Sequence, residues 1–341
     1  MIRRILLFFA FLVSFAPAKA QEEDPPETPE HATFPVSLLL ETAETAGGAE
    51  PLWRPDWPME LPPDLFRGRG GGSPFLSVEA AILPAGSEAQ RVYRFARDRE
   101  GRVREFPFLL GRVFFQAEFS YNDESLAAAI VLKGPGEADL LDLEVLEWED
   151  SRPSLIRVLQ GESYAFVFIQ RKAGGILEAW YDTEGRLLEA YDFTLAPQAG
   201  GDRIVSCRLR GNGGEERYDY DGRGFVTGIS GSPGDFSVLY YLEDLPRYRE
   251  YRPAASGEED PGAPAPGVYS LRWDEKAFLL SLSGIASGKD ADPVDCRYEY
   301  TLDEGGNWIE RREIRMIRGL GLLIPSPGVT IRRILEYEET E

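Results

Sequence analysis

The feature that most constrains the fold of this chain is a short pattern, Asp-x-x-Gly, which recurs at four positions. Asp at the first position of a tight turn accepts a hydrogen bond from the backbone amide two residues further on. Gly at the fourth position adopts the left-handed conformation that ends a type I turn with a bulge. The pattern therefore predicts hairpin turns at Asp98 and Gly101, Asp182 and Gly185, Asp219 and Gly222, and Asp303 and Gly306.

Short runs rich in aromatic and β-branched residues lie between these turns, and each is bounded by Gly, Asp, Asn or Pro. Such runs are typical of strands joined by hairpins. The clearest are residues 92–95, 113–121, 164–170, 204–209 and 236–242. We therefore predict a mainly all-β fold, an antiparallel hairpin meander forming an extended or curved sheet with little helix. Residues 124–133 fit either a helix or a strand.

The turns resemble the YD-repeat family, also called RHS-type repeats, whose unit reads roughly Tyr-Asp-x-x-Gly-Arg. Residues 181–186 and 218–223 fit this unit fully, residues 97–102 have Arg97 in place of the Tyr, and residues 302–307 lack both Tyr and Arg. The resemblance covers about half of the chain beyond residue 20. It implies a β-hairpin architecture made of a short, divergent set of repeats, and it implies no activity.

The N-terminus has the pattern of a secretory signal peptide. Arg3 and Arg4 precede an apolar run over residues 5–16, and Ala18 and Ala20 form a small-x-small cleavage site. The run is shorter than the roughly 20 residues that a helix needs to cross a bilayer. We expect cleavage after Ala20, export to the periplasm, cell surface or medium, and no membrane span in the mature chain.

Composition divides the rest of the chain. We expect a signal peptide at 1–20, a disordered acidic and Pro-rich spacer at 21–33, an irregular Gly- and Pro-rich segment at 34–74, a YD-repeat-like meander at 75–252, a Pro/Gly/Ala linker or long loop at 253–268, and a C-terminal hairpin unit at 269–341. Within the irregular segment, residues 34–40 are apolar and fit a first strand or a helical turn.

Charge and histidine content exclude several classes of function. With 58 acidic and 37 basic residues the net charge is -21, which repels phosphate backbones, so we expect no nucleic-acid partner. The one histidine, His31, lies in the acidic spacer, which disfavours His-dependent catalysis and metal centres. We predict no catalytic residue, cofactor or metal ligand. Cys207 and Cys296 either form one disulfide or remain separate thiols.

Acidic clusters provide two weaker alternatives. Glu147 and Glu149 flank Trp148, and paired carboxylates beside an aromatic ring suit glycoside hydrolysis, although a strand end running into a solvated turn accounts for the same residues. A second group of aspartates offers oxygens to calcium, with turn geometry as the alternative. Its members are Asp219, Asp221, Asp290 and Asp292.

Basic and aromatic side chains indicate where a partner could bind. A possible interaction face comprises Trp308, Arg311, Arg312, Arg315 and Arg318. Cross-strand pairing of these arginines with acids at 336–339 is the alternative. Aromatic residues at alternate strand positions favour packing between strands, with a carbohydrate platform as the alternative.

These observations favour an exported, non-enzymatic β-sheet interaction or structural module of the bacterial cell envelope. Its expected partner is an envelope protein or a glycan. The alternatives are a carboxylate-dependent enzyme acting on glycans and a carrier of an apolar ligand.

Overall fold

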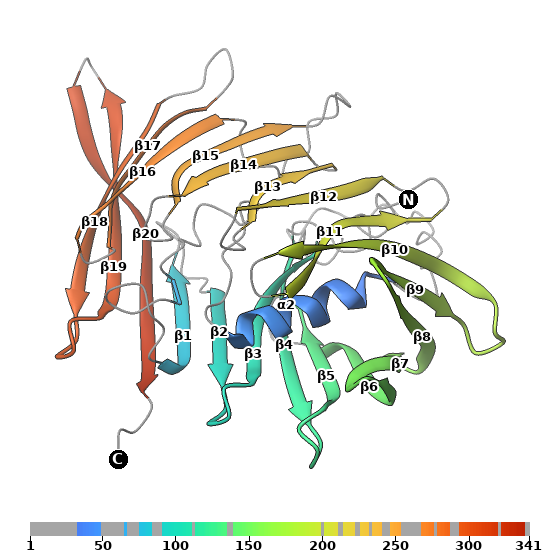
Figure 1. Cartoon of the computed structure of the whole chain (residues 1–341). Helices are drawn as coiled ribbons and strands as arrows, with labels where there is room; N and C mark the ends of the chain where they lie inside the picture. The colour runs from blue at the N-terminus through green and yellow to red at the C-terminus, as the bar shows by residue number, and fades with distance from the viewer. Residues whose placement is uncertain are drawn as a thin grey trace, which may run out of the picture. The chain divides into compact units, whose positions relative to one another are not determined.

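The computed structural model describes residues 33–48, 65–66, 75–83, 91–110, 113–134, 139–198, 201–210, 214–221, 226–231, 234–240, 246–253, 267–275, 278–286, 293–319 and 322–337. Within these ranges the chain forms twenty strands and one helix (Figure 1). The strands of each hairpin pair in the antiparallel sense. The prediction of an all-β meander with little helix is confirmed. His31, residues 1–20 and the segment 254–266 lie outside the described residues.

The chain divides into two compact units. Unit 1 contains residues 1–39, 108–195 and 206–215, and unit 2 contains residues 40–107, 196–205 and 216–341. This division follows contacts in space rather than chain order, as the pairing of residues 75–83 with residues 330–337 in unit 2 illustrates.

Unit 1 is an uninterrupted meander in which each strand pairs with the next along the chain. Its strands are β4 (Val113–Tyr121), β5 (Ala127–Lys133), β6 (Asp139–Glu149), β7 (Arg152–Gln160), β8 (Ser163–Lys172), β9 (Gly175–Tyr181) and β10 (Leu187–Gln198). The segment 124–133, for which helix and strand remained open, is a turn followed by β5. Ile130 and Leu132 are buried two residues apart, which is the period of a strand.

Unit 2 joins the two ends of the described chain in one run of strands. From β12 to β20 each strand pairs with its successor, β20 then pairs with β1, and β1 and β2 lead to β3. The strands are β12 (Glu215–Tyr220), β13 (Val226–Ser230), β14 (Gly234–Tyr240), β15 (Pro246–Pro253), β16 (Gly267–Trp273), β17 (Leu279–Ala286), β18 (Pro293–Leu302), β19 (Trp308–Gly319), β20 (Leu322–Tyr337), β1 (Phe75–Leu83), β2 (Arg91–Arg97) and β3 (Val103–Leu110). The remaining strand is β11 (Gly201–Leu209).

The helix, α2 (Val36–Gly48), lies in the segment that the sequence left open between a strand and a helical turn. Residues 36–40 are buried, as expected of an apolar helix start packed on a sheet. No helix within the described residues is long and apolar enough to cross a membrane.

Candidate functional site

Strand β8 carries aromatic side chains on the face that points away from the core. Ala165, Val167 and Ile169 are buried, with at most 3% of their surface exposed. On the opposite face Tyr164 and Phe168 are 41% and 48% exposed. Since successive side chains of a strand alternate between faces, β8 separates an aliphatic core face from an aromatic outer face.

The outer face continues onto β9 through a contact between rings. Tyr181 lies opposite Phe166 in the strand register, and its ring meets that of Phe168 edge-on with 5.5 Å between centroids. Tyr164 and Phe166 meet in the same T-shaped manner at 5.6 Å. Edge-to-face contacts hold aromatic rings in defined orientations. We call Tyr164, Phe166, Phe168 and Tyr181 the aromatic row.

The turn that follows β9 forms one end of this row. Oδ1 of Asp182 accepts the backbone amides of Glu184 and Arg186, both at 2.9 Å, and Oδ2 accepts Nε of Arg186 at 2.7 Å. The bonds from the side chain and amide of Arg186 hold the pKa of Asp182 below its usual range. Asp182 is therefore an ionised carboxylate whose two oxygens are both engaged within its own turn.

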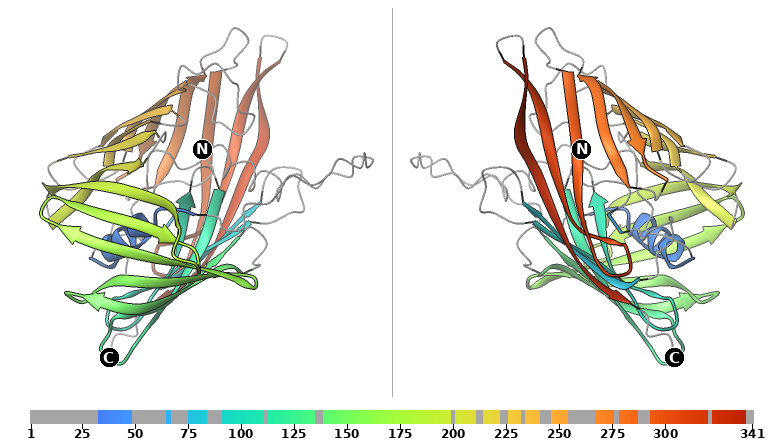
Figure 2. Two further views of the ribbon diagram at one scale, coloured as in Figure 1. Left: turned by 90° about the vertical axis from the view of Figure 1, so that its right-hand side faces the viewer. Right: turned by 90° about the vertical axis from the view of Figure 1, so that its left-hand side faces the viewer.

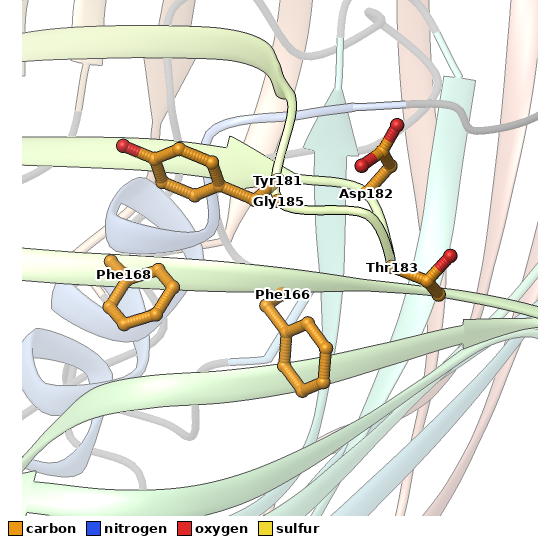
Figure 3. Close-up of a pocket in the computed structure, with 6 residues that line it drawn as sticks. All are labelled: Phe166, Phe168, Tyr181, Asp182, Thr183 and Gly185. Atoms are coloured by element: carbon orange, nitrogen blue, oxygen red, sulfur yellow. The ribbon is translucent and has the colours of Figure 1, made fainter.

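A hollow of about 430 Å³ lies between the row and the turn, lined by Phe166, Phe168, Tyr181, Asp182, Thr183 and Gly185. Figure 3 shows the three rings on the strands, with Asp182 and Thr183 at the turn. The arrangement offers flat apolar surfaces beside a hydroxyl group, and its one carboxylate is already engaged. Such a site is suited to binding rather than to proton transfer, which requires an acid or base within reach of a ligand.

The opposite face of β9 is fixed by a buried carboxylate. Glu178 accepts the backbone amides of Val36 at 3.0 Å and Ser37 at 2.7 Å, and Nε1 of Trp180 at 2.8 Å. Burial raises the pKa of Glu178, while these donors act in the opposite direction. Glu178 thus serves as a cap for α2 provided by a distant strand.

A second cluster continues this buried face onto β10. The hydroxyl groups of Thr33 and Tyr191 both donate to Oε2 of Glu189, and burial raises the pKa of Tyr191. Phe34 and Trp180 pack with 5.6 Å between ring centroids. These contacts hold the aromatic row on a rigid support, since the strand that carries Tyr181 is anchored from behind.

The basic residues singled out in the sequence divide between the interior and the surface of unit 2. Trp308 and Arg311 are buried, with 1% and 2% exposed, and the Arg311 guanidinium lies over the ring of Tyr298 at 4.6 Å. Arg312 and Arg315 are exposed and pair with Glu310 at 2.7 Å and Glu313 at 2.5 Å on their own strand. Arg318 lies near the end of β19, opposite Leu323.

Three of the four Asp-x-x-Gly segments form the same turn. Asp98, Asp182 and Asp303 each accept, on Oδ1, the backbone amide four residues on, at 2.9, 2.9 and 2.8 Å. Gly101, Gly185 and Gly306 all have φ of 79°. At the remaining position Asp219 lies inside β12, opposite Gly228, because the alternation of Tyr218 and Tyr220 continues the strand. Gly222 is outside the described residues.

Two further turns of this type were missed from the sequence. The backbone amide of Asn122 donates to the Leu126 carbonyl at 2.9 Å, and Oδ1 of Asn122 accepts the Leu126 amide at 2.9 Å. Ser125, with φ of 64°, replaces the glycine. In the second turn Oδ1 of Asp274 accepts the backbone amide of Phe278 at 2.8 Å, and the Asp274 amide donates to the Phe278 carbonyl at 2.9 Å. A search for Asx-x-x-x-apolar at strand ends, rather than Asp-x-x-Gly, would have found both.

The remaining candidates lie apart from the hollow. Glu147 and Glu149 are exposed on β6, opposite Leu155 and Arg152. Nε1 of Trp148 donates to the Ala127 carbonyl at 3.0 Å. Asp290 and Asp292 are outside the described residues. Cys207 and Cys296 are buried free thiols in this structure, and burial raises the pKa of Cys296 to about 12.

The aromatic row was not assigned as a site from the sequence. The signal was present in the spacing Tyr-x-Phe-x-Phe over residues 164–168, which places three rings on one face of a strand. Sequence alone does not show which face is the core. The buried row of Ala165, Val167 and Ile169 decides it, because the aliphatic face occupies the interior.

No family model matches this chain, and no curated protein matches it. Among solved structures, a porin-like protein from Bacteroides uniformis ATCC 8492 is similar with 10% identity and a TM-score of 0.36, covering 77% of this chain and 97% of that one. A TcdB2-TccC3-Cdc42 complex has 11% identity and a TM-score of 0.27, covering 71% of this chain and 15% of that one.

A Tc holotoxin pore from Photorhabdus luminescens is similar at 11% identity and a TM-score of 0.27, covering 74% of this chain and 15% of that chain. This chain therefore spans a small part of the toxin chains and almost the full length of the porin-like protein. At such identities and TM-scores, none of these likenesses assigns a family or a function.

Proposed function

We propose that this chain is an exported, non-enzymatic β-sheet module of the cell envelope that binds a neutral glycan along the aromatic row of unit 1. The observation that carries the proposal is the exposure of Tyr164 and Phe168 on a strand whose other face is fully buried. Sugar rings expose C–H faces that pack on aromatic rings. Their hydroxyl groups form hydrogen bonds with nearby polar groups, such as the side-chain hydroxyl of Thr183.

Charge restricts the class of glycan. Asp182 is held in its ionised form beside the rings, and Glu184 lies exposed in the same turn. Together with the net charge of -21, these carboxylates disfavour a polyanionic ligand. A neutral or weakly basic sugar chain is the ligand class that fits.

The engagement of Asp182 also separates binding from catalysis. Glycoside hydrolysis needs two carboxyl groups facing the same bond, one of which protonates the leaving group. Both oxygens of Asp182 are occupied by Glu184 and Arg186, and a depressed pKa keeps the group from acting as an acid. The site therefore supports a module that holds its ligand unchanged.

Membership of the YD-repeat family and location in the envelope are parts of the same proposal. Kinship is supported by the shared bonds of Asp98, Asp182 and Asp303 at the ends of their strands. Export is supported by the sequence pattern from Arg3 to Ala20. An exported protein in the cell envelope would meet the glycans that are attached to that envelope.

The test is calorimetric titration of the chain starting at Gln21 with neutral β-glucan oligosaccharides and with muropeptides released from peptidoglycan. We expect binding to the neutral β-glucan oligosaccharides and weaker binding to the muropeptides, whose stem peptides carry carboxylates. Phe168→Ala should lose about tenfold or more in affinity for the β-glucan oligosaccharides, because an aromatic stacking contact is removed. Ile334→Ala is the control, since Ile334 is 69% exposed on β20 in the other unit.

The outcomes separate the alternatives. Binding that is unchanged in Phe168→Ala would show that the row is not the site. If the chain captured an envelope protein and bound no glycan, the partner would be a protein rather than a glycan. Release of sugar from either substrate, abolished by Glu147→Gln, would favour the enzyme instead.

A further inference from the structure

The hairpin of β19 and β20 continues past its neighbours. The pairing of β19 with β18 extends to Arg315, and the pairing of β20 with β1 extends to Thr330. The two strands go on pairing with each other to Gly319 and Leu322, as the long red hairpin of Figures 1 and 2 shows. We call Met316–Gly319 with Leu322–Pro325 the tip ribbon.

Large aliphatic side chains are exposed on both faces of the tip ribbon. Ile317, Leu322 and Ile324 share one face, with Ile317 opposite Ile324, and are 51%, 68% and 48% exposed. Leu323, on the other face, is 52% exposed. Further along β20, Ile331 is fully buried. The apolar surface thus changes from internal to external along one strand.

The distribution over two faces restricts what covers the ribbon. A flat partner surface would cover one face and leave the other in water. Strand addition to β20 is disfavoured as well, because Pro325 and Pro327 lack N–H groups and, two residues apart, they remove donors from the same edge of β20. An occupant that surrounds the ribbon and requires no backbone hydrogen bonds fits both observations.

Charge indicates the same occupant. No acidic residue lies between Glu313 and Glu336, whereas this stretch contains Arg315 and Arg318 at the ribbon. The chain as a whole carries a net charge of -21. Arg315 is 53% exposed and keeps its bond to Glu313. An apolar tip with arginines beside it, on an acidic protein, is complementary to a bilayer surface with anionic headgroups.

We propose that the tip ribbon inserts into the interfacial layer of an anionic phospholipid bilayer and attaches the protein to that surface. Ile317, Leu322, Leu323 and Ile324 enter the boundary between headgroups and acyl chains, and Arg315 remains at headgroup level. The attachment is peripheral and reversible, since a few aliphatic side chains add limited buried area. It uses the part of the β19–β20 hairpin that lies beyond the pairings with β18 and β1, and it is independent of glycan binding.

The experiment is flotation of the protein with vesicles of phosphatidylcholine containing phosphatidylglycerol, and with vesicles of phosphatidylcholine alone. Both the full chain and the chain from Gln21 are tested, because residues 5–16 are themselves apolar. We expect binding to the anionic vesicles, weakened at high salt. The double variant Leu322→Ser with Leu323→Ser should lose about tenfold or more in partitioning, in both chains.

Ile334→Ser is the matched control, because Ile334 is 69% exposed on β20 away from the ribbon. Thermal unfolding of each variant verifies that the fold is kept. Failure of both chains to float, or equal flotation of the double variant, would overturn the proposal. So would self-association that the double variant abolishes without any vesicle binding, since a second copy would then cover the ribbon.

Glycan titration of the double variant keeps the two proposals apart. Unchanged glycan affinity is expected, because the aromatic row belongs to the other unit. Loss of vesicle binding together with intact glycan binding supports both sites as independent. Loss of glycan affinity in the double variant would contradict the independence of the two sites, because it would show that the tip ribbon contributes to glycan binding.

Discussion

The carboxylate of Glu178 accepts the backbone amide of Ser37 at 2.7 Å, across 141 positions of the sequence. The first amides of a helix have no partner within the helix, so a side chain from elsewhere must satisfy them when they are buried. Ser37 and Glu178 are both fully buried. The bond therefore fixes where α2 begins and holds that helix start to β9.

Replacing Glu178 by Gln should lower the free energy of unfolding by about 1–3 kcal/mol, because an amide NH₂ nitrogen accepts no hydrogen bond, whereas both oxygens of a carboxyl group can accept N–H groups whether it is protonated or ionised. The loss should be largest at about pH 5 and smaller at about pH 8. Burial raises the pKa of Glu178 above 4.5 in the folded state, so the wild-type chain loses stability as pH rises through the folded pKa. Gln does not titrate. Urea unfolding at both pH values measures the difference.

Glu189→Gln is the control for this prediction, since Glu189 lies in the same buried region and accepts hydroxyl groups rather than helix amides. A stability difference between wild type and Glu178→Gln that grows with pH would contradict the expected decrease. It would mean that the three donors and the helix N-terminus outweigh burial and keep Glu178 charged.

Neighbouring residues on β8 should respond to truncation to different degrees. Phe168→Ala should cost about 1 kcal/mol of folding stability, because the side chain is half exposed and loses mainly its contact with Tyr181. Ile169→Ala should cost about 2–5 kcal/mol, since it leaves a cavity in the core. Thermal or urea unfolding of the two variants measures this. Equal losses would show that the outer face also packs against protein.

The turns and the period of the strands could be predicted from the sequence because they depend on local chemistry. Gly185 is required by a positive φ, and Asp182 by the amides of its own turn. The buried positions of Arg311 and Trp308 could not be predicted. From the sequence, Arg311, two residues from Glu313, is expected at the surface. Its burial follows only from the strand register, which places it between Tyr300 of β18 and Ile331 of β20.

The cap of α2 and the aromatic row depended on information that the sequence does not contain. Glu178 sits among Leu177 and Ala179 in a strand, and nothing local marks it as the partner of an amide so far away. The row was visible as a pattern, but either face of β8 fitted the core until the neighbouring strands were placed. Long-range register, rather than propensity, decided both features.

Substitutions at the left-handed position of the turns should change folding stability through backbone conformation alone. A Cβ at Gly185 would meet nothing within 4 Å, so Gly185→Ala should cost about 1–2 kcal/mol from φ alone. Ser125→Gly should stabilise the chain by about 0.5–1 kcal/mol, because Ser125 holds the same conformation with a side chain. Gly134→Ala, also unobstructed and without a positive φ, should change stability by less than about 0.5 kcal/mol. A cost at Gly134 equal to that at Gly185 would rule out the conformational explanation.

Arg333 should prove more important to stability than its exposed neighbour Arg332. Its guanidinium lies 3.6 Å from the centre of the Trp308 ring, and it donates from Nε to the Trp308 carbonyl at 2.9 Å and from Nη1 to the Leu65 carbonyl at 3.1 Å. A lysine ammonium cannot reach two carbonyls in the geometry of a planar fork. Arg333→Lys should therefore lower the free energy of unfolding by about 1.5–3 kcal/mol.

Arg332→Lys provides the matched control for Arg333→Lys. Arg332 has a side chain that is 62% exposed and pairs with Glu310 at 2.9 Å, so it should change stability by less than about 1 kcal/mol. Arg333→Lys should also speed proteolytic cleavage near Leu65, because the bond from β20 to the Leu65 carbonyl is lost. Equal stability of the two variants, with cleavage unchanged, would show that packing of Leu65 and Phe66 alone secures the segment.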